Sequence, residues 1–297
     1  MHFTFRGVRG SIPSPGPNTV KYGGNTTCIE VRGDDNEIII LDAGTGIFPL
    51  AQLLLAELPV TCNIFISHTH WDHIQGLPFF VPIFIPGNKI TIHGAADPIT
   101  QRDVSEVLNR QMEYAYFPIR EAELNANINY VSVKDRQTFE IGSVKVENIL
   151  MNHPAMNYGY KVTSGGKSLF FTGDHEWPYN IYEPDDEDYD EFEEQIQQQR
   201  KETIDFISGV DVLIVDTAYT DEEYPAKKGW GHGTFSTSIA VAREAGVKRC
   251  FFTHHEPTRS DANLEKAFQE ALEKNADGKI DNEPEFILAQ EGVQIDL

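Results

Sequence analysis

Short runs of hydrophobic residues, separated by glycine, aspartate and other turn residues, occur along the whole chain. Runs of this length that are rich in Val, Ile and Phe are typical of buried β-strands. Between and after them lie stretches with apolar residues at helical spacing, which predict amphipathic helices. The pattern predicts strands at residues 28–32, 37–41, 62–67, 89–93, 144–150, 159–163, 168–171, 212–215 and 249–253, and helices at 46–57, 97–110, 192–207 and 234–245.

Strands and helices are interleaved in both halves of the chain, and no Pro/Gly/Ser-rich linker or change of composition separates the halves. We therefore predict an α/β (α+β) protein in which mixed sheets are covered by helices, folding as one domain over residues 1–297. The helix at 97–110 is predicted from an Asp-Pro start signal, and Thr234 is the expected N-cap of the helix at 234–245.

The composition narrows the class of protein. With 40% hydrophobic and 24% charged residues it is typical of soluble globular proteins, and no apolar run approaches the roughly 20 residues of a membrane span. The formal net charge of −22 disfavours a large nucleic acid, because such partners are bound through Lys and Arg. Much of the acidity lies at 183–194, where we expect a solvated loop and helix start, with a partner-facing or gating role as the alternative.

Three cysteines, Cys28, Cys62 and Cys250, each lie in or beside an apolar run. An odd number without C-x-x-C spacing predicts buried free thiols, not disulfides or a thiolate zinc site. The first residues contain no basic segment followed by an apolar stretch, so we expect no secretory signal and a cytoplasmic location.

The clearest chemical signal is the segment H-T-H-W-D-H at residues 68–73, which is separated from the apolar run 63–66 only by Ser67. Imidazole and carboxylate groups are the ligands that suit zinc and its neighbours, and a strand ending at Ser67 would present His68 and His70 together. An exposed polar turn without a bound ion is the alternative. The spacing favours a metallohydrolase.

Other candidate ligands also follow apolar runs. Taken one at a time, such residues are more often caps or turn residues, but their shared position at strand ends indicates a common site. They are Asp42, His153, Asp174 and His254.

With these motifs the chain resembles the metallo-β-lactamase-fold hydrolase superfamily over nearly its whole length, and within it the ribonuclease Z-like and phosphodiesterase-like branch. The segments that carry the resemblance are Y-G-G-N-T-T-C at 22–28, L-D-A-G-T-G at 41–46, the histidine segment continued to Gly76, and G-H-G-T at 231–234. The H-x-H-x-D-H motif is highly specific, and the glycine motifs support it. The resemblance implies a four-layer αβ/βα sandwich with the metal site at one edge.

The resemblance also implies two divalent cations. Asp42 would hydrogen-bond within the histidine loop and orient a ligand. His254 and His255 are adjacent, and similarity to the ribonuclease Z-like branch favours His254. Zinc is the first choice on ligand type, with manganese or iron as alternatives. The implied ligands are His68, His70 and His153 for the first cation and Asp72, His73 and His254 for the second, with Asp174 bridging both.

The implied chemistry is hydrolysis by a hydroxide that the two cations share, with Asp72 or Asp174 orienting the attacking water. His232 matches the histidine of a Gly-His-Ser-Thr segment that assists phosphodiester cleavage in this branch, although Gly233 replaces the serine. A capping or packing role is the alternative for His232. Oxygen-reducing di-iron members commonly carry a glutamate where His70 stands, so the ligand set favours hydrolysis over redox chemistry.

Together these features predict a phosphodiesterase that acts on a small phosphodiester such as a cyclic nucleotide. The alternatives are a ribonuclease Z-like nuclease, a carboxyl-ester, thioester or lactam hydrolase, and a regulatory binding protein that retains the fold. Relatives in the branch suggest a homodimer. Aromatic residues near the G-H-G-T segment could stack on a base and two lysines could attract a phosphate, although such aromatics more often pack in a core: Tyr219, Tyr224, Trp230, Phe235, Lys227 and Lys228.

Overall fold

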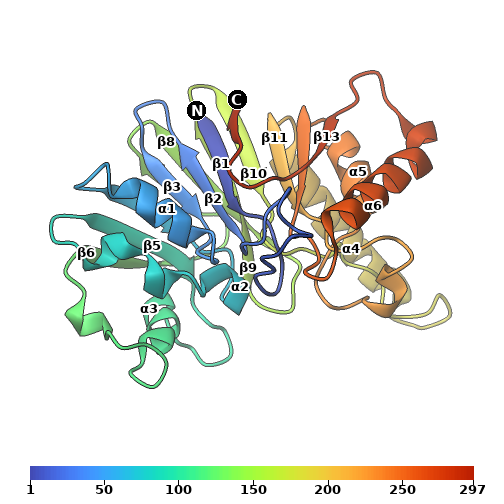
Figure 1. Cartoon of the computed structure of the whole chain (residues 1–297). Helices are drawn as coiled ribbons and strands as arrows, with labels where there is room; N and C mark the ends of the chain where they lie inside the picture. Colours follow the sequence, from blue (N-terminus) through green and yellow to red (C-terminus); the bar gives the residue numbers. More distant parts are fainter.

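The strands form two seven-stranded mixed sheets that face each other in the computed structural model, which describes all 297 residues (Figure 1). The first sheet has the order β14-β1-β2-β3-β4-β5-β6, with β1 His2–Gly7, β2 Cys28–Arg32, β3 Ile38–Leu41, β4 Thr61–Phe65, β5 Lys89–Ala95, β6 Asn127–Val133 and β14 Gln294–Asp296. The second has the order β13-β12-β11-β10-β9-β8-β7, with β7 Thr138–Ile141, β8 Val144–Met151, β9 Asn157–Ser164, β10 Lys167–Phe171, β11 Val212–Asp216, β12 Arg249–Thr253 and β13 Glu285–Leu288.

The direction of the strands decides at which edge of each sheet their carboxyl ends lie. In the first sheet β3 to β6 are parallel. In the second, β10 to β13 are parallel, and β8 runs in the same direction because β9 is antiparallel to both of its neighbours. The carboxyl ends of parallel strands lie at one edge of a sheet, which is where open α/β sheets bind ligands.

Helices cover the outer face of each sheet (Figure 1). One hydrophobic core lies between the two sheets. Each sheet also has one core between its outer face and the helices that cover it. The layers are therefore helix, sheet, sheet and helix, which confirms the predicted αβ/βα sandwich. The helices are α1 Ile47–Leu54, α2 Trp71–Ile74, α3 Val104–Asn109, α4 Tyr189–Ile207, α5 Phe235–Glu244 and α6 Asp261–Lys274, with 3₁₀ turns η1 Leu77–Phe79, η2 Val81–Phe84, η3 Arg110–Met112, η4 Glu121–Glu123, η5 Tyr224–Ala226 and η6 Ala276–Gly278.

All nine predicted strands and three of the four predicted helices are confirmed within a few residues. The predicted start of the helix at 97–110 is wrong. The Asp97 carboxylate accepts hydrogen bonds from the backbone N–H groups of Ile99 and Thr100, which holds a turn, and α3 begins only after its N-cap Asp103. Thr234 caps α5 as expected, accepting from the Thr237 N–H. The pattern missed the helices α2 and α6 and the strands β1, β6, β7, β13 and β14.

The remaining expectations concern the surface and the thiols. The acidic segment 183–194 forms an exposed turn followed by the first turns of α4. All three cysteines are free and buried, as predicted. None of the helices combines the length and the hydrophobicity that crossing a bilayer requires.

Candidate metal centre

The predicted ligands converge at the edge where the parallel strands end. From the first sheet, His68 follows β4, and Asp72 and His73 lie in the short helix α2. From the second sheet, candidate residues follow three strands that run in one direction: His153 after β8, Asp174 after β10 and His254 after β12. Residues separated by up to 186 positions are thus brought together by strand direction and by the packing of the two sheets.

The side chains form two clusters that share one carboxylate, the first being His68, His70, His153 and Asp174 and the second Asp72, His73, Asp174 and His254. In the first, His153 Nε2 lies 3.2 Å from His70 Nδ1. In the second, His254 Nε2 lies 3.2 Å from Asp72 Oδ2. Asp174 points Oδ2 toward His68 Nε2, at 3.5 Å, and Oδ1 toward His73 and His254, at 3.1 and 3.3 Å.

These separations fit bound cations. Ligand atoms at about 2.0–2.1 Å from one tetrahedral ion lie about 3.3 Å from each other. Moreover, His68 Nε2, His73 Nε2 and Asp174 Oδ1 are buried without a hydrogen-bond partner, which is costly for a polar atom that binds nothing. The donor set of imidazole nitrogens and carboxylate oxygens suits a zinc-like ion in each cluster.

In His68, His73 and His153 the outer nitrogen lies within hydrogen-bond distance of a partner, which leaves the other nitrogen facing the cluster. His73 Nδ1 lies 2.7 Å from Asp42 Oδ2, and His153 Nδ1 lies 2.9 Å from the Gly231 carbonyl oxygen. Ser67 Oγ lies 3.1 Å from His68 Nδ1 and donates to Asp42. Asp42 therefore lies inside the histidine loop, within hydrogen-bond distance of Ser67 and of the candidate ligand His73.

The two clusters differ in electrostatics. Burial lowers the pKa of His68, His70 and His153 below its ordinary value, which favours the neutral imidazole that binds a cation. Burial acts in the same direction on His73 and His254, but the neighbouring carboxylates, Asp174 foremost, together outweigh it and raise the pKa of both well above the ordinary value. The second cluster thus attracts positive charge.

Solvent reaches the site from one side only. His254, His73 and Asp174 are at most 3% exposed, whereas His70 is exposed and His153 is half-buried. The loop after β1 covers the second cluster, since the Ser11 N–H donates to Asp72 Oδ2 at 2.6 Å. Access is therefore through the first cluster.

The structure separates the two adjacent histidines at the end of β12. His254 adopts the left-handed backbone conformation, with φ of 58°, and turns its imidazole into the second cluster. His255 is fully buried on the other side, where its Nε2 lies 2.9 Å from the Ala289 carbonyl oxygen. Only His254 is placed to act as a ligand.

His232 lies beside both clusters. Its ring stacks on His254 with centroids 4.7 Å apart, and its Nδ1 lies 2.8 Å from Asp216 Oδ2. Burial lowers the pKa of His232, but Asp216 outweighs burial and raises the pKa above its ordinary value. The Nε2 atom makes no hydrogen bond within the protein and is free to meet a substrate.

The sequence pattern did not identify two acidic residues that lie next to the site, Asp216 and Glu176. Asp216 ends β11 directly after the apolar run 212–215, so the strand-end pattern that marked the other candidates also marked it. Glu176 gave no such signal: it is 3% exposed and accepts hydrogen bonds from Gly229 N at 2.9 Å, Gly231 N at 2.9 Å and Tyr224 Oη at 2.7 Å. It fixes the loop that leads into His232.

The aromatic residues near His232 divide into two groups. Tyr219 and Phe235 are buried, and Phe235 belongs to the core beneath the second sheet. Trp230 is 57% exposed, with Lys227 Nζ 4.0 Å from the centre of its ring. Lys228 Nζ lies 3.8 Å from the centre of the Tyr179 ring.

Comparisons with known proteins agree with this geometry. A family model described as "Beta-lactamase superfamily domain" matches residues 37–255. Ribonuclease Z from Staphylococcus aureus (strain MSSA476) is 23% identical over 304 residues, which cover 92% of this chain and 94% of the relative. Among solved structures, the metallo-beta-lactamase fold protein YhfI from Bacillus subtilis has a TM-score of 0.66 at 17% identity, covering 99% of both chains. Yeast PDE1 has a TM-score of 0.64 at 16% identity, covering 100% of this chain and 99% of the other.

Proposed function

Since this chain belongs to the beta-lactamase superfamily, we propose that it is a metal-dependent phosphodiesterase that hydrolyses a small phosphodiester. The observation that carries the proposal is the position of His232 beside two ligand clusters that share Asp174. Thioester hydrolysis does not require an imidazole as a proton donor at this position, because a thiolate leaves without being protonated. A phosphodiester does, because its leaving oxygen needs a proton.

We propose distinct roles for the side chains. His68, His70 and His153 would hold one cation, Asp72, His73 and His254 the other, and Asp174 both. Divalent cations bound there supply Lewis acidity, which lowers the pKa of a water molecule and offsets negative charge on the phosphoryl oxygens. Asp72 would also orient the attacking water, and Asp42 would hold His73 in the ligating tautomer. His232, held by Asp216, would contact the phosphate and protonate the leaving oxygen.

We propose zinc as the cation, because neutral imidazoles with a shared carboxylate are ligands that zinc prefers. Elemental analysis of the purified protein tests this proposal. Two zinc ions per chain are expected. Two manganese or iron ions per chain would show that the metal is not zinc, while the two-cation site itself would stand. The absence of any transition metal, with melting unchanged by chelation and remetallation, would refute the metal site itself.

A second candidate function is cleavage of an RNA phosphodiester. It is favoured by the similarity to a curated ribonuclease Z over 92% of this chain. The formal net charge of −22 opposes it, since a long polyanion is repelled unless many basic side chains contact its phosphates. Small phosphodiesters avoid most of this repulsion.

A turnover panel distinguishes these functions. The substrates are bis-p-nitrophenyl phosphate, 2′,3′- and 3′,5′-cyclic nucleotides, a transfer-RNA precursor, nitrocefin and a thioester, each tested with wild type and with His232→Ala. We expect hydrolysis of small phosphodiesters and a fall in kcat of about 100-fold or more in the variant, which is the usual contribution of a general acid. His2→Ala is the matched control, because His2 lies in β1 outside both clusters.

Three outcomes bear on the proposal. A kcat that falls in His232→Ala while both cations are retained supports it. Faster turnover of the transfer-RNA precursor than of any small phosphodiester would favour the nuclease. Hydrolysis of nitrocefin or the thioester alone, at a rate that His232→Ala does not change, would overturn the phosphodiester assignment.

A further inference from the structure

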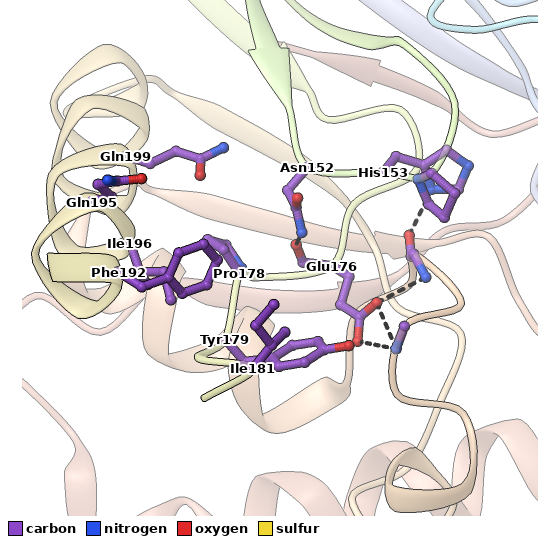
Figure 2. A pocket seen from close by; sticks show the side chains of 13 residues that line it. Asn152, His153, Glu176, Pro178, Tyr179, Ile181, Phe192, Gln195, Ile196 and Gln199 are labelled. Carbon is purple, nitrogen blue, oxygen red and sulfur yellow. Dashed lines mark hydrogen bonds between the residues drawn. The ribbon is translucent and has the colours of Figure 1, made fainter. Parts of the chain in front are cut away.

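A pocket of about 350 Å³ adjoins the first cluster, and His153 belongs to both (Figure 2). Gly231, whose carbonyl oxygen lies 2.9 Å from His153 Nδ1, also lines the pocket. Because the first cluster is the part of the site that solvent reaches, a group attached to a phosphate bound there can extend into this pocket.

One wall of the pocket is a single face of α4, formed by residues at spacing i, i+3, i+4 and i+7: Phe192, Gln195, Ile196 and Gln199. In the second half of α4, the buried positions are taken by Thr203, Ile204 and Ile207. Figure 2 shows the two glutamines on α4 across the pocket from Asn152 and His153. Neither glutamine side chain makes a hydrogen bond within the protein, so both amides are available to a ligand.

Contacts within the chain hold this wall in place without a ligand. The Asn180 side chain donates to the Tyr189 carbonyl oxygen at 3.0 Å and to Glu193 Oε2 at 3.1 Å, which ties the preceding loop to the start of α4. The Tyr182 ring packs edge-on against Phe192, with centroids 5.4 Å apart. A preformed wall lowers the entropic cost of binding.

The lining combines flat apolar surfaces with amides. Pro178, Tyr179, Phe192 and Ile196 supply the apolar surfaces. Asn152 donates to the Glu176 carbonyl oxygen at 2.8 Å, which leaves its side-chain oxygen as a free acceptor opposite the two glutamines. Glu176 is the only Asp, Glu, Lys or Arg in the lining, and its carboxylate already accepts hydrogen bonds from the 224–231 loop.

We propose that this pocket binds the nucleobase of a nucleoside phosphodiester whose phosphate lies at the two clusters, an inference that rests on the proposed function. A nucleobase is planar and stacks on aromatic and apolar side chains. The edge of a nucleobase carries both hydrogen-bond donors and acceptors. A primary amide can pair with both, because it has an NH₂ donor and a carbonyl acceptor.

Other occupants fit the lining less well. A second phosphate would meet no Lys or Arg in the pocket and would face the Glu176 carboxylate. An aliphatic group would leave three amides without partners on desolvation. The volume of about 350 Å³ is near the lower limit for ligand pockets, which suits one base with its sugar and not several bases of a polynucleotide.

Binding of nucleosides without phosphate tests the pocket independently of turnover. Adenosine, guanosine, cytidine and uridine are titrated into the metal-loaded protein by calorimetry, with wild type and the double variant Gln195→Ala/Gln199→Ala. The matched control is Gln197→Ala/Gln198→Ala, because these glutamines lie on the same helix, outside the pocket, and donate to Glu193 and Glu202. We expect at least one nucleoside to bind, with a Kd about tenfold higher in the pocket variant and unchanged in the control.

Two results would overturn the proposal: no nucleoside binding to wild type at millimolar concentration, or equal loss of binding in both double variants. Turnover of an alkyl phosphodiester, glycerophosphoethanolamine, separates this failure from failure of the proposed function. If the alkyl phosphodiester is hydrolysed at least as fast as every nucleotide and no nucleoside binds, the pocket proposal fails while the phosphodiesterase stands. If nucleosides bind but no phosphodiester is cleaved, the proposed function fails and the base pocket stands.

Discussion

The adjacent residues His254 and His255 offer a matched test of the metal site, because they are the same residue type at neighbouring positions and are both buried. His254→Ala removes a predicted ligand of the second cation. Loss of a group that only orients a ligand costs about 10–100-fold in metal affinity, so removal of the ligand itself should cost at least about 100-fold. His255→Ala removes no ligand. It leaves the Ala289 carbonyl oxygen buried without its partner, a loss of about 1–3 kcal/mol in the free energy of unfolding.

Metal content and urea unfolding together separate these effects. We expect wild type and His255→Ala to retain two cations per chain by elemental analysis, and His254→Ala to retain one. Unfolding in chelator should show the loss of stability in His255→Ala even without metal, whereas the stabilisation gained on adding zinc should be reduced only in His254→Ala. Two retained cations in His254→Ala, or loss of a cation in His255→Ala, would refute the assignment of the ligands.

Three further predictions concern residues around the site and the core. Asp216→Asn should lower kcat about 100-fold, by releasing His232, with both cations retained; a lost cation would make Asp216 a ligand instead. In Gly10→Ala the new Cβ would overlap the imidazole of His254, so the affinity for metal should fall. Gly16→Ala is the control: a Cβ there meets nothing within 4 Å, so this variant should bind metal as wild type does. Burial lowers the pKa of His93 to about 4, below the unfolded value of about 6.5, so protonation favours the unfolded chain. The contribution of His93 to stability should be complete above about pH 7.5 and fall by about 2 kcal/mol on lowering to pH 5 in urea unfolding. His93→Phe should remove this part of the pH dependence, and an unchanged slope would show that His93 does not titrate in this range.

Much of the fold could be predicted because hydrophobic spacing reflects local burial. The strands that were found all lie inside the two sheets, and some of them, such as β3 and β11, are buried along their whole length. Four of the five strands that were missed, β6, β7, β13 and β14, are the edge strands of the two sheets, and β6 and β7 are mostly exposed or partly buried. Their pairing is decided by neighbours distant in sequence, which a local pattern does not encode.

The candidate ligands could be predicted in part for a different reason. His68 to His73 lie in one short segment, so their proximity follows from the covalent chain. His153, Asp174 and His254 were marked only as residues after strands, and it was the resemblance that joined them into one ligand set. Asp216 carried the same mark and was overlooked.

The sequence by itself determined the type of chemistry, because imidazoles and carboxylates at this spacing have few other uses, and it determined the alternation of strands and helices, because burial leaves a local period. Only the tertiary structure decided which of His254 and His255 faces the second cluster, which carboxylate holds His232, and that one face of α4 closes a pocket beside His153. These choices depend on strand direction, backbone conformation and the packing of two sheets, and therefore on contacts between residues far apart in the chain.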